Sequence, residues 1–122
     1  MTDITERTEA LLTAMGWTRR LNGMWAVDVP KWERDTVTAS RPSLDWCFRH
    51  AIPWATARGW AVMVDRELDD WLSDEMQEEA HVDVRTPMTY SQSLRWKPGE
   101  PDRTAEAIVT ALYDALMGER DG

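Results

Sequence analysis

The chain has 122 residues, of which 43% are hydrophobic and 30% are charged, and its formal net charge at pH 7 is −8. This balance excludes an intrinsically disordered chain, and no apolar run is long enough to predict a membrane-spanning helix. The negative charge excludes a general nucleic-acid-binding protein, because such proteins neutralise phosphates with clustered Lys and Arg. We therefore expect one domain, residues 1–122, with no membrane partner and no direct nucleic-acid partner.

Residues 3–15 are predicted to form an amphipathic helix, because their apolar positions recur on one face of a 3.6-residue period. Asp3 or Thr5 can cap its start, and Gly16 supplies a left-handed stop. This segment is therefore expected to present one apolar face to the core.

Two further helices are predicted downstream. Ser43 is expected to cap a helix that runs to residue 58, and Pro53 inside it should kink or break it near His50. The closing helix is predicted to end at Gly118, and its core face consists of Ala105, Ile108, Val109, Leu112 and Leu116.

Five segments between these helices have the composition or alternation of strands, at residues 17–21, 24–29, 60–65, 81–85 and 88–96. Asn22-Gly23 predicts a hairpin between the first two, and residues 31–42 are expected to form a polar loop. Residues 67–80 are ambiguous, with an apolar residue at every fourth position favouring a short helix. The order predicts an α+β fold, with a mainly antiparallel sheet of about five strands covered by two or three helices, as an α-β-α sandwich.

Four short motifs carry a family resemblance: Met15-Gly16-Trp17 after the first helix, Pro42-Ser43 with Asp45 at the second, Trp96 on a strand, and Thr104-Ala105-Glu106-Ala107-Ile108 in the closing helix. In these features the chain resembles the small phage proteins described as an α-β-α, or "ABA", sandwich domain. Residues 66–80 and Pro53 depart from that pattern. The resemblance implies a phage or prophage origin and a layered α/β fold, and it carries no catalytic residues.

The residue types needed for metal or nucleophilic chemistry are sparse. Cys47 and His50 would share a helical face, but a zinc site needs further ligands, and His81 is the only other histidine. There is no nucleophile elbow, Gly-rich phosphate loop or His-Glu motif. We therefore expect no metal, no cofactor and no enzymatic activity. The single cysteine excludes an intrachain disulfide and favours a cytoplasmic protein, in the host cell if the protein is phage-encoded.

Eight tryptophans in so short a chain are unusual. Trp25 and Trp60 are expected in the core, whereas four others near element ends are expected to be half-exposed: Trp17, Trp32, Trp71 and Trp96. Half-exposed indoles are enriched at subunit interfaces, so the sequence predicts a homo-oligomer.

Cations accompany two of these indoles, and an aromatic ring beside a cation can stack a base and hold a phosphate. The leading hypothesis is thus a non-catalytic binding protein of phage type, acting in counter-defence, that sequesters a small anionic, nucleotide-like ligand. Its candidate ligand-binding residues are Trp17, Arg19, Arg20, Arg95, Trp96 and Lys97. The competing interpretation is that these cationic side chains only extend into solvent from a solvated sheet edge.

Two alternatives to ligand capture remain open. Between Asp65 and Asp83 the chain has nine acidic residues and one basic residue. Segment 67–83 is therefore the alternative surface, an inhibitor of a basic host protein or a nucleic-acid mimic, with Asp69, Asp70, Glu78 and Glu79 as its candidate partner-binding residues. The other alternative is a structural or accessory phage protein without a ligand.

Overall fold

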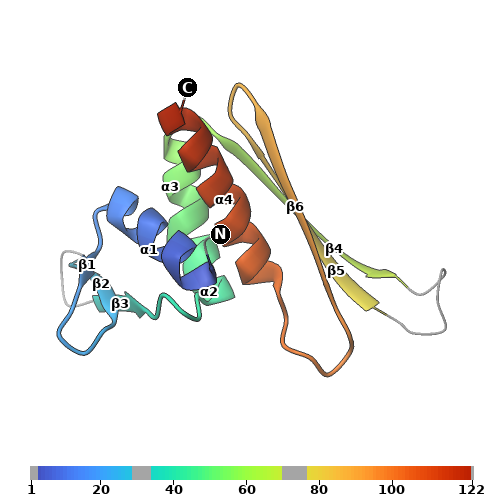
Figure 1. Ribbon diagram of the computed structural model, residues 1–122, viewed down its shortest axis with the longest axis horizontal. Helices are drawn as coiled ribbons and strands as arrows, with labels where there is room; N and C mark the ends of the chain where they lie inside the picture. Colours follow the sequence, from blue (N-terminus) through green and yellow to red (C-terminus); the bar gives the residue numbers. More distant parts are fainter. Residues whose placement is uncertain (1–2, 29–33, 70–76, 122) are drawn as a thin grey trace.

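The computed structural model describes residues 3–28, 34–69 and 77–121, and its helices lie between two small sheets (Figure 1). The first sheet has the order β1-β2-β3, with strands Thr18–Arg19, Trp25–Asp28 and Arg34–Val37. The second has the order β4-β5-β6, with strands Ala61–Asp69, Gln77–Arg85 and Thr89–Trp96. All pairings within both sheets are antiparallel.

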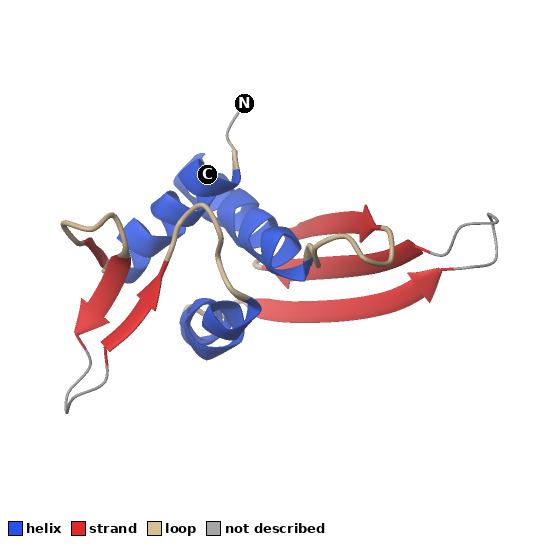
Figure 2. Ribbon diagram, turned by 90° about the horizontal axis from the view of Figure 1, so that it is seen from below, coloured by secondary structure: helices blue, strands red, loops and turns tan. Residues whose placement is uncertain are grey.

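The α+β class and the antiparallel pairing confirm the sequence-based prediction, but a single sheet of about five strands is wrong. Residues 34–37, predicted as part of a loop, form β3 and pair with β2. This pairing adds a third strand to the first hairpin and makes it a separate sheet. The helices lie between the two sheets rather than on both faces of one, so the layers do not follow the predicted α-β-α order (Figure 2).

The first helix, α1, spans Ile4–Met15 and has the predicted ends. The Asp3 carboxylate accepts a hydrogen bond from the Glu6 backbone N–H at 2.9 Å, which satisfies a donor of the first turn. Gly16 ends the helix in the left-handed region with φ of 86°. No helix within the described ranges is long and apolar enough to cross a bilayer.

The second helical segment is continuous, and Pro53 does not break it. It consists of α2 (Leu44–Trp46), a π-helical turn η1 (Cys47–Ala51) and α3 (Ile52–Ala57). Ser43 caps it as predicted, accepting a hydrogen bond from the Trp46 N–H at 3.0 Å. Proline has no N–H, and the widened π turn, in which the Ile52 N–H reaches the Cys47 carbonyl, brings the chain to Pro53 without a break.

The helix favoured over residues 67–80 is wrong for the part that the structure describes. β4 continues to Asp69 and β5 begins at Gln77, so both ends of this segment are strand, while residues 70–76 lie outside the described residues. Apolar residues four apart share a face of a strand as well as of a helix, so their spacing does not separate the two. The β4–β5 hairpin extends beyond the helices (Figure 1).

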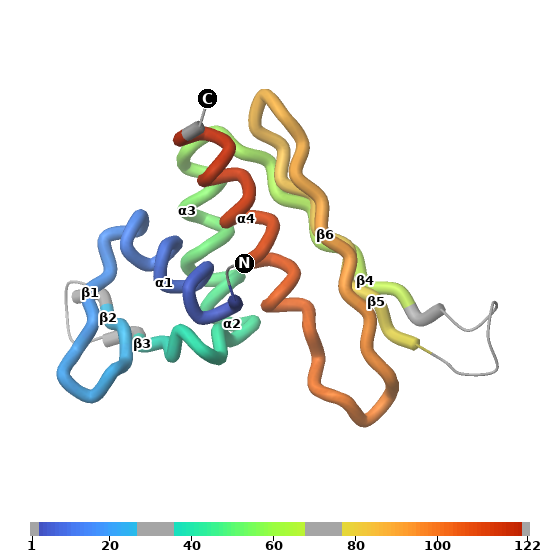
Figure 3. Tube along the Cα trace, in the orientation of Figure 1, coloured from blue at the N-terminus to red at the C-terminus, as the bar shows by residue number. Residues whose placement is uncertain are grey.

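The last helix, α4, spans Thr104–Asp121 and lies against β5 and β6, with α1 packed on its other side. The chain reaches it from β6 through a loop, residues 97–103 (Figure 3). Its predicted core face is confirmed, because Ile108, Val109, Leu112 and Leu116 are buried. The predicted end at Gly118 is wrong: the helix continues past it, and the missing side chain makes room for Tyr90 of β6 instead.

The hydrophobic core is one cluster that draws on both sheets and on the helices between them. Trp25 and Val37 come from the first sheet, Val82 and Trp96 from the second, and Leu112 from α4. Both sheets therefore direct one face toward the helices, and the opposite faces remain as candidate binding surfaces.

Candidate functional site

A hollow of about 730 Å³ lies at the β1–β2 hairpin of the first sheet. Cross-strand partners share a sheet face, so Trp25 and Val37 mark the core face, and Ala26 and Thr36 mark the opposite face, where the hollow lies. We call it the arginine hollow; its lining residues are Arg19, Arg20, Leu21, Asn22, Met24, Ala26 and Thr36.

Backbone hydrogen bonds of a tight hairpin loop position the side chains of the arginine hollow. The Arg20 N–H donates to the Met24 carbonyl at 2.7 Å, and the Gly23 N–H donates back to the Arg20 carbonyl at 2.9 Å. Gly23 has φ of 84°, the left-handed value that this three-residue loop requires. The Asn22 side chain accepts from the Met24 N–H at 3.1 Å. The predicted Asn22-Gly23 hairpin is confirmed, and its loop orders Arg20 next to Met24.

The chemical character of the arginine hollow is mixed. Arg20 pairs with Met24 on the face of the hollow and supplies a guanidinium group, a group that binds carboxylate and phosphate oxygens in a planar, bidentate fashion. Arg19 also lines the hollow, but it is the cross-strand partner of Trp25, so its side chain starts from the core face of the sheet. Leu21 is fully exposed and Met24 is half-buried, so apolar surface adjoins the cations. Arg19 also borders a smaller hollow that includes Glu9 of α1, which leaves Arg20 as the arginine tied to this site alone among the hollows described.

Trp17 does not join the arginines at the hollow. The Trp17 N–H donates to the Leu12 carbonyl at 2.9 Å, and this turn after Gly16 directs the indole into the core. Its side chain meets the Trp46 and His50 rings edge to face, at centroid distances of 6.2 and 5.0 Å. The expected half-exposure of Trp17 is therefore wrong.

The other three predicted ligand residues, Arg95, Trp96 and Lys97, lie at the end of β6, in the second sheet. The helices separate them from the arginine hollow (Figure 1). Trp96 is buried, again contrary to expectation, and its indole N–H donates to the Glu78 carboxylate at 2.6 Å. The Arg95 guanidinium pairs with Glu79 at 3.5 Å. The sequence-predicted ligand residues thus divide between two distant places.

Two of the four indoles on which the predicted homo-oligomer rested are buried and do not support it. Trp17 and Trp96 are covered by their own chain, and Trp32 and Trp71 lie outside the described residues. The core positions predicted for Trp25 and Trp60 are confirmed. A long aromatic side chain near the end of an element reaches the core as readily as solvent, which the sequence does not show.

The residues of the acidic alternative are only partly available to a partner. Glu78 and Glu79 are half-buried and engaged by Trp96 and Arg95, as described above. Asp69 is the last residue of β4, and Asp70 lies outside the described residues. The carboxylates that are exposed on the described part of the hairpin belong to Asp65 and Glu67, which the sequence did not single out as partner residues.

A polar cluster on the outer face of the second sheet was not predicted. His81 Nδ1 lies 2.6 Å from the Ser93 hydroxyl, and His81 Nε2 lies 3.1 Å from the Asp83 carboxylate. The Ser91 hydroxyl donates to the same Asp83 oxygen and, as the largest cause, holds the pKa of Asp83 below its ordinary value. His81–Ser93 and Asp83–Ser91 are cross-strand neighbours and His81 and Asp83 are two apart on β5, so knowing the β5–β6 register would have revealed the cluster.

The cluster has the residue types of a Ser-His-Asp triad in a different arrangement. In such a triad the serine bonds to Nε2 and the carboxylate to Nδ1, and preorganised donors stabilise the oxyanion. Here the two nitrogens have the opposite partners, and the residues lie along an open strand pair. The arrangement therefore differs from that of a catalytic triad.

The Cys47 thiol is buried and approaches the Ala105 carbonyl at 3.9 Å. Burial raises the pKa of Cys47 to about 12, so the thiolate needed for metal binding or nucleophilic attack does not form near neutral pH. Within the described part of the chain, no group of three His, Cys, Asp or Glu side chains has a geometry that could hold a metal ion.

Comparisons of this chain with protein-family models, with curated proteins and with solved structures find no match. The resemblance to the phage sandwich domains therefore stays a prediction.

Proposed function

We propose that this protein is a non-catalytic binding protein that holds a small organic anion, of the nucleotide type, in the arginine hollow. The observation that carries the proposal is the hollow itself, in which Arg20 adjoins the apolar side chains of Leu21 and Met24 in about 730 Å³. Small-molecule sites generally have this make-up, with an apolar lining, a few placed polar groups and volumes of roughly 300 to 1,000 Å³. Arg20 is expected to bind the anionic group, and Leu21 and Met24 to contact the apolar part.

The charge distribution supports an anion at this end of the molecule. Residues 1–60, which include the first sheet, hold eight Arg and Lys against seven Asp and Glu. Residues 61–122 hold six against fifteen. An anion approaching the arginine hollow therefore meets less repulsion than one approaching the second sheet.

The test is a titration of isotope-labelled protein with adenosine monophosphate, followed by backbone amide NMR. We expect shifts concentrated at residues 19–24 and at Thr36, with weaker effects from inorganic phosphate or adenosine alone. Arg20→Glu should weaken binding by about tenfold or more, since a charge-assisted bond is replaced by repulsion. Arg95→Glu is the matched control, because it makes the same charge change on the other sheet, and it should leave the affinity within about twofold.

A capture experiment with a basic protein separates the alternatives. If the acidic hairpin is the working surface, Asp65→Asn and Glu67→Gln should abolish capture of a basic protein partner, while Arg20→Glu leaves that capture unchanged. The hairpin supports this second candidate because it extends beyond the helices and exposes both carboxylates (Figure 1). Absence of nucleotide shifts at residues 19–24, or equal loss in the Arg20 and Arg95 variants, would contradict the arginine hollow as the binding site.

A further inference from the structure

The second sheet has an open edge at β6. Among the described residues β6 pairs only with β5, over eight consecutive residue pairs, and it forms one border of the sheet (Figure 2). Its sequence from Thr89 to Trp96 contains no proline and no glycine, and one charged residue, Arg95. Such an edge is a template for pairing with another strand, and proteins commonly protect exposed edges with charges, prolines or bulges.

The hairpin turn fixes which backbone groups of β6 face this edge. The Thr86 N–H donates to the Met88 carbonyl at 2.7 Å, so these two residues form a hydrogen-bonded pair. In an antiparallel ladder such pairs alternate with non-bonded ones, so Tyr90, Gln92 and Leu94 bond to β5. The N–H and C=O groups of the odd-numbered residues, Ser91 and Ser93 among them, therefore point away from β5.

The side chains agree with this assignment. Non-bonded pairs bring their side chains closest, and Ser91 contacts Asp83 while Ser93 contacts His81 across the β5–β6 ladder. The outward amides of Ser91 and Ser93 are thus positioned to bond a further strand without disturbing the existing sheet.

We propose that a second copy of this chain occupies the edge, with the two β6 strands antiparallel about Gln92 and both sheets joined into one of six strands. This register is self-complementary, because Ser91 lies opposite Ser93 of the second copy and Tyr90 lies opposite its Leu94. Arg95, the charged residue of β6, lies opposite Thr89, so no like charges meet. The pairing uses the outward amides of Ser91 and Ser93 as donors in both copies.

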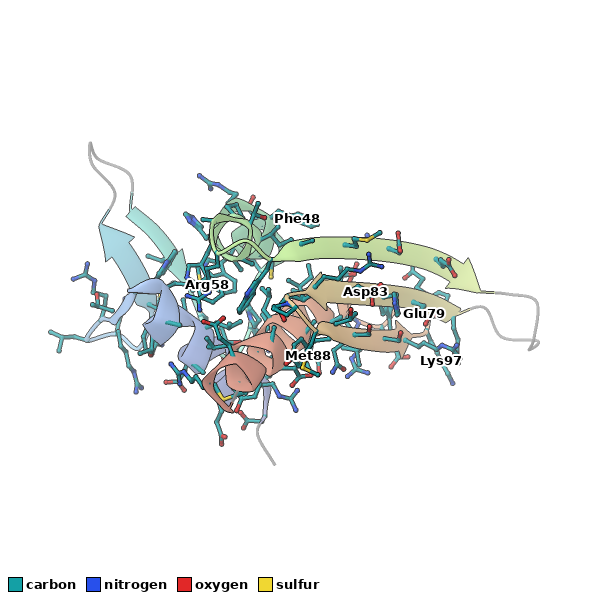
Figure 4. The ribbon with its side chains drawn as sticks, turned by 90° about the horizontal axis from the view of Figure 1, so that it is seen from above. Phe48, Arg58, Glu79, Asp83, Met88 and Lys97 are labelled. Carbon is teal, nitrogen blue, oxygen red and sulfur yellow. The ribbon has the colours of Figure 1, made fainter. Side chains whose placement is uncertain are left out.

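The exposed side chain of Met88, directly before β6, also favours a second copy at this edge. Met88 is 67% exposed, and the register places it opposite Trp96 of the second copy. Figure 4 shows Met88 and Lys97 at opposite ends of β6, so one antiparallel contact brings the start of each strand to the end of the other. Covering the exposed Met88 side chains at both ends then adds to the backbone bonds at the centre.

The opposite edge, β4, does not suit a second copy. Asp65 and Glu67 are exposed on one face of β4. Antiparallel self-pairing centred on this part of the strand would place carboxylates of the two copies opposite or diagonal to each other, which is destabilising. The charge pattern therefore disfavours self-pairing along this part of β4, whereas β6 brings no like charges together.

Disulfide trapping tests the register directly. The twofold axis places residue 92 opposite itself as a non-bonded pair, with about 4.5 Å between Cα atoms, which is within disulfide range. Gln92→Cys should form a disulfide-linked dimer on mild oxidation. Ser93→Cys is the matched control; its side chain is more exposed, but it faces Ser91 rather than itself, so it should link much less. The buried Cys47 does not compete.

The assembly state gives a second, independent measurement. The unmodified protein should be a dimer by light scattering at about 100 µM, because a high protein concentration favours association through a small interface by mass action. Ser91→Pro removes an outward N–H and should shift the protein to monomer, whereas Ser91→Ala keeps the amide and should remain dimeric. Circular dichroism checks that each variant is folded. A monomeric unmodified protein, equal linking of the two cysteine variants, or a dimeric folded Ser91→Pro variant would each overturn the proposal.

Discussion

Gly118 of α4 lies directly against the hydroxyl end of Tyr90 in β6. A Cβ built on Gly118 would stand well inside van der Waals distance of the Tyr90 hydroxyl oxygen and of its ring. The residue is thus not the helix stop that its identity suggests but a point of close approach between the closing helix and the sheet. This contact explains a glycine within a helix, where it costs about 1 kcal/mol relative to alanine.

We predict that Gly118→Ala destabilises the protein by about 1 to 3 kcal/mol, the usual range for forcing extra volume into a packed site. The clash should outweigh the gain in helix propensity. In a Tyr90→Ala background the clash is absent, so the same substitution should stabilise the helix by up to about 1 kcal/mol. Urea denaturation of the four proteins measures both values, and an equal effect of Gly118→Ala in both backgrounds would refute the contact.

The buried Cys47 predicts a loss of stability in alkaline solution. Burial raises its pKa from 9.0 to about 12, so between these values the unfolded chain releases a proton that the folded chain keeps. The contribution of the protonated thiol to the free energy of unfolding is fully present below pH 9 and is lost as the pH rises toward 12. Over this window the free energy of unfolding falls with a limiting slope of about 1.4 kcal/mol per pH unit. Cys47→Ala should give a shallower decline of the unfolding free energy over this window, although it is less stable at neutral pH. Parallel declines in the two proteins would show that the thiol is not the cause.

The Asp83 carboxylate predicts a specific change in titration. The Ser91 hydrogen bond is the largest cause of its lowered pKa, with His81 and Arg85 also favouring the charged form. Ser91→Ala should therefore raise the Asp83 pKa toward its ordinary value, as measured by carboxyl carbon NMR. Because the folded pKa is lowered, this contribution to stability is present above the unfolded value and is lost as the pH falls through the folded value. Ser93→Ala is the control, since Ser93 bonds to His81 rather than to Asp83.

Features decided by neighbours along the chain were predictable. The caps at Asp3 and Ser43 depend on side chains within three residues of the bonded amide, and Gly16 ends α1 through its own backbone freedom. The core face of α4 follows from the helical spacing of its apolar residues, which can be read from the sequence alone. The sequence also places Arg19 and Arg20 directly before the predicted Asn22-Gly23 hairpin turn. These three lining residues of the arginine hollow, Arg19, Arg20 and Asn22, were therefore predictable as neighbours.

Features decided by distant contacts were not predictable. β3 forms because residues 34–37 pair with β2, and this pairing places Thr36 among the lining residues of the arginine hollow. The four-residue apolar spacing near residues 67–80 suits a helix or a strand face equally, and pairing of β4 with β5 selected the strand.

The two tryptophans beside cations show most clearly what the tertiary structure decided. From sequence, Trp17 with Arg19-Arg20 and Trp96 with its flanking cations are equivalent motifs. The structure buries both indoles, pairs Arg95 with Glu79 in the second sheet and places Arg19 and Arg20 among the lining residues of the arginine hollow. Local sequence determined which elements form and where they start, because caps and periodicity act over a few residues. Only the packing of two sheets around shared helices decided which side chains meet, because burial and pairing depend on residues far apart in the chain.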